Sequence, residues 1–115
     1  MRIPSALFLP FLLLLAAPVS AACQRPGPAP ALPNGAKADQ AAMTAAHDLI
    51  QTYVHSLEAY QACLRDQAEQ APPDTAPQLK ATWIAQGEAA IDLAQSLAAG
   101  YSAALKQFRE RSSTK

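Results

Sequence analysis

Two stretches of the chain repeat apolar residues at alternating intervals of three and four, the spacing of a helix packed along another helix. The first stretch runs from Asp39 to about Gln70 and contains no glycine or proline. Asp39 is a suitable N-cap, because its carboxylate can accept from the free amides of the first turn. The pattern predicts a helix over about 39–70 whose apolar seam is Met43, Ala46, Ile50, Tyr53, Leu57, Tyr60 and Leu64.

The second stretch follows Pro72 and Pro73, which lack the amide hydrogen that a helix needs and therefore end the first one. Thr75 and Gln78 have the spacing of a capping box, and Pro77 is tolerated in a first turn. The pattern predicts a second helix over about 76–111. Its expected seam is Ile84, Gly87, Ile91, Ala94, Ala98, Tyr101, Leu105 and Phe108.

The connection between the two stretches is short, so the helices are expected to lie antiparallel. In that arrangement Tyr60 faces Gly87, Tyr53 faces Ala94, and Ala46 faces Tyr101. Each tyrosine thus meets a glycine or alanine, which lets large and small side chains interdigitate. The predicted fold is all-α, an antiparallel two-helix hairpin over 39–112. Gly100 lies outside the seam, and the pattern gives no reason for it.

A third apolar run, Leu7 to Leu15, follows Arg2 and precedes the small residues Ser20, Ala21 and Ala22. This order is typical of a secretory signal peptide, and the run is too short to cross a bilayer as a helix. Residues 1–22 are therefore predicted to be a signal peptide. The mature chain is expected to work in the periplasm or outside the cell, with no stable transmembrane segment.

Export changes how the two cysteines are interpreted. In an oxidising compartment, Cys23 and Cys63 most simply form one disulfide. The alternative is lipidation of Cys23 at the new N-terminus, which predicts an outer-membrane lipoprotein. Ser20 disfavours that alternative, because lipoprotein signals usually carry an apolar residue there, and lipidation would leave Cys63 unpaired.

The segment 23–38 contains four prolines, Pro26, Pro28, Pro30 and Pro33, which favour an extended polyproline conformation. Asp39 to Cys63 spans roughly 36 Å along a helix, and the fifteen residues between Cys23 and Asp39 reach roughly 46 Å when extended. The segment is thus long enough to run back along the first helix. We predict an extended Pro-rich strap that the disulfide holds against the hairpin.

This chain resembles small uncharacterised exported proteins of Gram-negative bacteria over residues 23 to about 65. The shared features are the early cysteine, the Pro-rich run, Pro33-Asn34-Gly35-Ala36, Met43 and Glu58-Ala59-Tyr60-Gln61-Ala62-Cys63-Leu64. The chain departs from the pattern at Asp39 and Ala42, where the resemblance implies a full capping box. The resemblance supports the cysteine pair and the hairpin, and it implies no activity.

Charge and motifs argue against several classes of function. Without Arg2, eight basic residues stand against nine acidic ones, which is too balanced for a nucleic-acid-binding surface. No nucleophile elbow, haem-attachment motif or phosphate-binding loop occurs in the sequence. We therefore expect no enzyme and no cofactor. The remaining chemical alternative is a small metal or ligand carrier that uses His47, Asp48, His55 and Glu58 across a dimer.

Four apolar residues lie beside the second seam: Leu79, Trp83, Leu93 and Leu97. They either bury against the strap or a second copy of the hairpin, or they form a partner-docking face with Trp83 as its anchor. The first functional hypothesis is a non-catalytic periplasmic structural or protein-interaction module. It would act as a homodimer or bind an envelope protein through its helix faces. The second is a lipid-anchored envelope protein tethered through Cys23.

Overall fold

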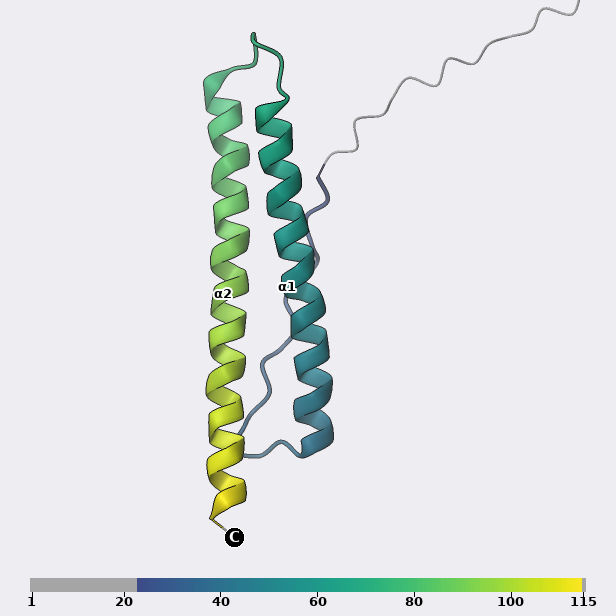
Figure 1. The fold of residues 1–115 in the computed structure, drawn as a ribbon, viewed down its shortest axis with the longest axis vertical. Coiled ribbons are helices and arrows are strands. Elements are labelled where there is room, and N and C mark those ends of the chain that lie inside the picture. The colour runs from purple at the N-terminus through teal and green to yellow at the C-terminus, as the bar shows by residue number, and fades with distance from the viewer. Residues whose placement is uncertain (1–22, 115) are drawn as a thin grey trace, which may run out of the picture.

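The computed structural model describes residues 23–114, and the predicted signal peptide lies outside this range. Within it the chain forms two helices and no strand: α1 spans Gln40–Glu69 and α2 spans Pro77–Ser113. Residues 70–76 turn the chain back, and the helices lie side by side in opposite directions (Figure 1). The predictions of an all-α chain and of a two-helix hairpin are confirmed.

The two helices begin in different ways. Asp39 caps α1 as predicted, and its Oδ1 accepts a hydrogen bond from the Ala42 amide at 2.8 Å. The capping role predicted for Thr75 is wrong. The N-cap of α2 is Ala76, which makes no side-chain hydrogen bond, and the Thr75 amide donates to the Pro72 carbonyl within the turn. Pro77 sets the start of α2, because its fixed φ suits the first helical position and its missing amide leaves no donor unpaired.

The core is built from large residues on α1 and mostly small residues on α2. The buried positions of α1 are Met43, Ile50, Leu57, Tyr60 and Leu64. Those of α2 are Gly87, Ala90, Ala94, Leu97 and Ala104. Small side chains on one helix let the large ones of the other fill the space between the backbones without leaving cavities. The buried positions thus combine large residues of α1 with mostly small residues of α2.

The seam predicted for α2 is partly wrong, because the helix is rotated about its axis from the expected orientation. Ile84 is 40% exposed and Ala98 is exposed, whereas Leu97 and Ala104 are buried. The level at which the helices pair is nearly as predicted, since Gly87 lies against Gln61, one residue from the expected Tyr60. The N-terminal segment also packs on α2, at Gly100 and Ala104.

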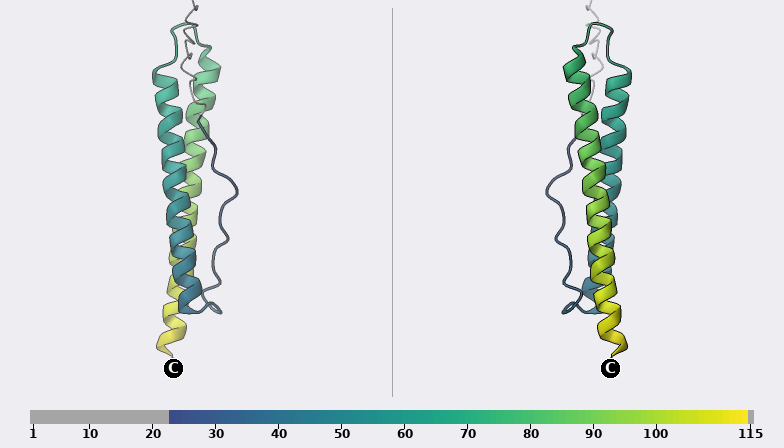
Figure 2. Two further views of the ribbon diagram at one scale, coloured as in Figure 1. Left: turned by 90° about the vertical axis from the view of Figure 1, so that its right-hand side faces the viewer. Right: turned by 90° about the vertical axis from the view of Figure 1, so that its left-hand side faces the viewer.

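Residues 23–38 lie on one face of the hairpin (Figure 2). The segment starts beside α1, crosses to the C-terminal half of α2, and returns to the start of α1 (Figure 1). Leu32 packs over Gly100, and Gly35 is buried against the backbone of Ala104. A Cβ on Gly100 would overlap the Leu32 side chain. This contact explains the glycine that the helical pattern left without a reason.

Neither α1 nor α2 is long and apolar enough to cross a membrane.

Replacing Gly35 by alanine should destabilise the protein. The added Cβ would overlap the carbonyl oxygen of Ala104, which belongs to a helix backbone and cannot turn aside. Overpacking of this kind costs about 1–3 kcal/mol, and each kcal/mol lowers the melting temperature of a domain this size by about 4–8 °C. Thermal unfolding followed by circular dichroism measures the effect.

Gly27→Ala is the matched control, because a Cβ at Gly27 meets no atom within 4 Å and its φ is not positive. A compatible glycine-to-alanine change leaves stability unchanged or raises it by up to about 1 kcal/mol. Equal melting temperatures for the two variants would show that Gly35 does not contact α2.

Candidate functional site

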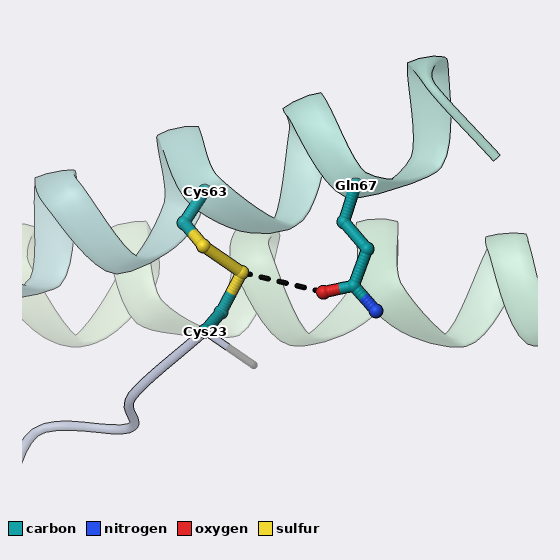
Figure 3. Close-up of a disulfide and its surroundings, with 3 residues drawn as sticks. All are labelled: Cys23, Cys63 and Gln67. Carbon is teal, nitrogen blue, oxygen red and sulfur yellow. Dashed lines mark hydrogen bonds between the residues drawn. A yellow bond between two sulfur atoms is a disulfide. The ribbon is translucent and has the colours of Figure 1, made fainter. Parts of the chain in front are cut away.

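A disulfide joins the N-terminal segment to α1. Cys23 and Cys63 are bonded, with their Cα atoms 5.7 Å apart and a sequence separation of 40. Figure 3 shows the Gln67 side chain, one turn further along α1, against this bond, with Oε1 3.3 Å from the Cys23 sulfur. A disulfide sulfur carries no hydrogen, so this is a packing contact. The expected cysteine pair is confirmed.

Three further contacts follow along the segment. The Tyr53 hydroxyl of α1 donates a hydrogen bond to the Gly27 carbonyl at 2.6 Å. Leu32 covers Gly100 of α2, and the Arg111 guanidinium of α2 donates to the Ala38 carbonyl. The segment is therefore attached to α1 near its beginning and to α2 further along.

A groove runs beside the first part of this segment, and we call it the strap groove. Its volume is about 380 Å³. The N-terminal segment, α1 and α2 all contribute to its lining. The lining residues are Arg25, Pro26, Gly27, Tyr53, Leu57, Tyr60, Gln86, Ala89, Ala90 and Leu93. A second hollow, of about 570 Å³, is lined by the segment and α1, and it shares Arg25, Pro26, Gly27, Tyr53 and Tyr60 with the first.

Most of the strap groove is apolar, and its polar groups are few. Arg25 is its sole charged lining residue. Tyr60 is 8% exposed, and its hydroxyl has no hydrogen-bond partner among residues 23–114, unlike that of Tyr53. No completely enclosed side-chain nitrogen or oxygen of the described residues lacks a partner. The Tyr60 oxygen therefore reaches the molecular surface, at the hollows that this residue lines.

The residues predicted to form a docking face are divided by the structure. Leu79 and Leu93 lie on the surface, 45% and 38% exposed. Trp83 is half-buried and packs against the core. Leu97 is 6% exposed and belongs to the core that α1 and α2 share. Of the two alternatives, burial applies to Leu97, and Trp83 is largely occupied by intramolecular packing.

The residues of the metal-carrier alternative do not gather in one place. The His47 ring packs on Tyr101 with centroids 5.4 Å apart, and its Nδ1 lies 3.4 Å from Asp48 Oδ1. His55 and Glu58 are exposed on α1. Within residues 23–114, no three His, Cys, Asp or Glu side chains are placed to share a metal ion.

Sequence patterns missed the strap groove because it belongs to no single element. Arg25 and Gly27 were grouped with a Pro-rich extended run, and Gln86 and Ala89 lie outside any apolar seam. The one sequence feature that could have indicated the groove was the predicted strap, since a third layer over two helices creates hollows along its edges.

Comparisons of this chain with known protein families, with curated proteins and with solved structures found no match.

Proposed function

We propose that this chain is an exported, non-catalytic module of the periplasm, with a structural or protein-binding role. The observation that carries the proposal is the disulfide between Cys23 and Cys63. Such bonds persist in oxidising compartments and are rare where thiols are kept reduced. Together with the signal peptide predicted over residues 1–22, the bond supports a location outside the cytoplasm.

The Pro-rich strap gives this module its rigidity. A two-helix hairpin buries one stripe of each helix and is marginal on its own. The strap adds a third layer, and each of its ends is held, by Cys63 at one and by the start of α1 at the other. A rigid hairpin with Leu79 and Leu93 on its surface is suited to present a fixed face to a second copy or to an envelope protein.

Lipidation of Cys23 is the competing proposal. It requires the same sulfur that bonds to Cys63, so one chain cannot carry both modifications. The strap would then be a tether to the membrane, and its contacts with Tyr53 and Gly100 would have to be made without the covalent link. The proposal of a strapped module therefore predicts an unmodified Cys23.

The chemical state of Cys23 is measured by intact mass. The chain is expressed with its own first 22 residues in a Gram-negative host, recovered from the periplasm, and weighed before and after reduction. We expect a mature chain that begins at Ala22 or Cys23 and gains about two hydrogens on reduction. A mass raised by acyl chains on Cys23, or retention in the membrane, would contradict the proposal and favour the lipoprotein.

Removing the disulfide should strongly destabilise the module. A closed loop of 40 residues is worth about 3–4 kcal/mol in the chain-entropy model. We expect the double variant Cys23→Ser/Cys63→Ser to melt at a much lower temperature than the oxidised parent. An unchanged melting temperature would show that the strap does not stabilise the hairpin.

Tyr53→Phe tests whether the strap needs the disulfide in order to stay docked on α1. The variant loses the hydrogen bond to the Gly27 carbonyl, which is worth about 1 kcal/mol. If the disulfide holds the strap in place, the loss appears in the oxidised protein and shrinks in the double serine background. Equal losses in the two backgrounds would mean that the strap docks without the bond.

A further inference from the structure

We propose that the strap groove binds an amphiphile with an apolar chain and an anionic head group, of the fatty-acid type. This goes beyond the structural or protein-binding role proposed above and does not depend on it. The inference rests on the shape of the groove, on the unpaired hydroxyl of Tyr60, and on the charge of Arg25.

The groove has the size and lining of a small-molecule site. Its volume of about 380 Å³ falls in the range of ligand pockets, which are largely apolar with a few polar groups that fix orientation. Leu57 of α1 and Ala90 of α2 are buried apolar residues of the lining, and Leu93 of α2 lines the groove with 38% of its surface exposed. An apolar chain lying there would cover surface that the folded protein leaves in contact with water.

Tyr60 points to a polar group on the ligand. The side chain is more than nine-tenths buried, yet no described residue accepts a hydrogen bond from its hydroxyl. Its hydroxyl oxygen reaches the molecular surface, so a group bound at that surface can pair with it in place of water. Since Tyr60 lines the groove, a bound carboxylate can accept this hydrogen bond.

The charge at the groove sets the sign of the head group. Arg25 is the one ionisable basic residue of the lining, and no acidic residue opposes it. A guanidinium forms short, charge-assisted hydrogen bonds with a carboxylate. The groove therefore favours an anion over a neutral or cationic amphiphile of the same length.

The strap itself disfavours an extended peptide as the occupant. A peptide that adds beside an extended segment gains affinity from main-chain hydrogen bonds. Pro26 and Pro28 have no amide hydrogen to donate, and the Gly27 carbonyl between them already accepts from Tyr53. An acyl chain needs no such partners.

The test is a calorimetric titration of the oxidised, mature protein with decanoate and with decan-1-ol, both below their aggregation concentrations. We expect one decanoate to bind per chain and decan-1-ol to bind more weakly. Arg25→Gln should weaken decanoate by about tenfold, the loss of a charged hydrogen bond, and leave decan-1-ol nearly unchanged. Tyr60→Phe should weaken decanoate by about threefold without lowering the melting temperature, because the hydroxyl has no partner to lose.

Ala89→Trp provides a steric block, since Ala89 is an exposed residue in the α2 wall of the groove. Ala99→Trp is the matched control, because Ala99 is equally exposed on α2 and does not line the groove. We expect the first variant to abolish binding of both probes and the second to bind as the parent does, with similar melting temperatures.

Three results would overturn the proposal. One is the absence of saturable binding by the folded, oxidised parent protein. Another is binding that Ala89→Trp and Ala99→Trp affect equally, which would place the ligand elsewhere. The third is a protein that dimerises in sedimentation and is made monomeric by Ala89→Trp, which would make the groove an interface between copies. None of these results bears on the mass measurement at Cys23, so the two proposals fail independently.

Discussion

Helix α2 has to pack against two neighbours at once, and this constraint organises the molecule. On one side α1 needs small residues, so that its own large side chains can fill the interface, and Ala90 and Ala94 provide them. On the other side the Leu32 side chain of the N-terminal segment occupies the space that a Cβ on Gly100 would take. In an ordinary packing of two helices, each helix needs one apolar stripe. Here the buried residues of α2 are mostly small, and the helix contains Gly87 against α1 and Gly100 beneath Leu32. These close contacts give a reason for glycines inside a helix, where each costs about 1 kcal/mol relative to alanine.

The disulfide allows such a small core to suffice. Extended proline-rich chain makes few internal hydrogen bonds, so its docking depends on a handful of contacts with the helices. A covalent link at Cys23 keeps the segment near those contacts in the unfolded chain as well, which reduces the entropy that folding must overcome. Prolines act in the same direction, because they restrict the unfolded backbone before any contact forms. The strap and the disulfide therefore stabilise the fold together, by reducing the entropy that the chain loses on folding.

Sequence patterns predicted the local features of this fold better than the relations between its layers. The cap at Asp39, the stop at Pro72 and the cysteine pair each depend on a few residues whose chemistry is read directly. The apolar and small residues of α2 fit two adjacent helical stripes, and the predicted seam placed Ile84 inside and Leu97 outside. The choice between the two stripes is made by packing against other parts of the chain, which the pattern of one helix does not contain. The candidate groove was equally invisible, since its walls come from three separate parts of the chain.

The groove follows from the path of the strap. The segment contacts a different helix in each of its two parts. Cys23 and Gly27 attach it to α1, whereas Leu32 packs on α2. Before the crossing point, the valley between the helices is therefore covered from the α1 side alone, and its α2 wall stays open. An unbroken third helix would have filled that valley along its whole length. An extended segment cannot do so, because it carries fewer side chains per unit area of the surface that it crosses. The proposed ligand site is thus a consequence of closing a two-helix core with an extended chain.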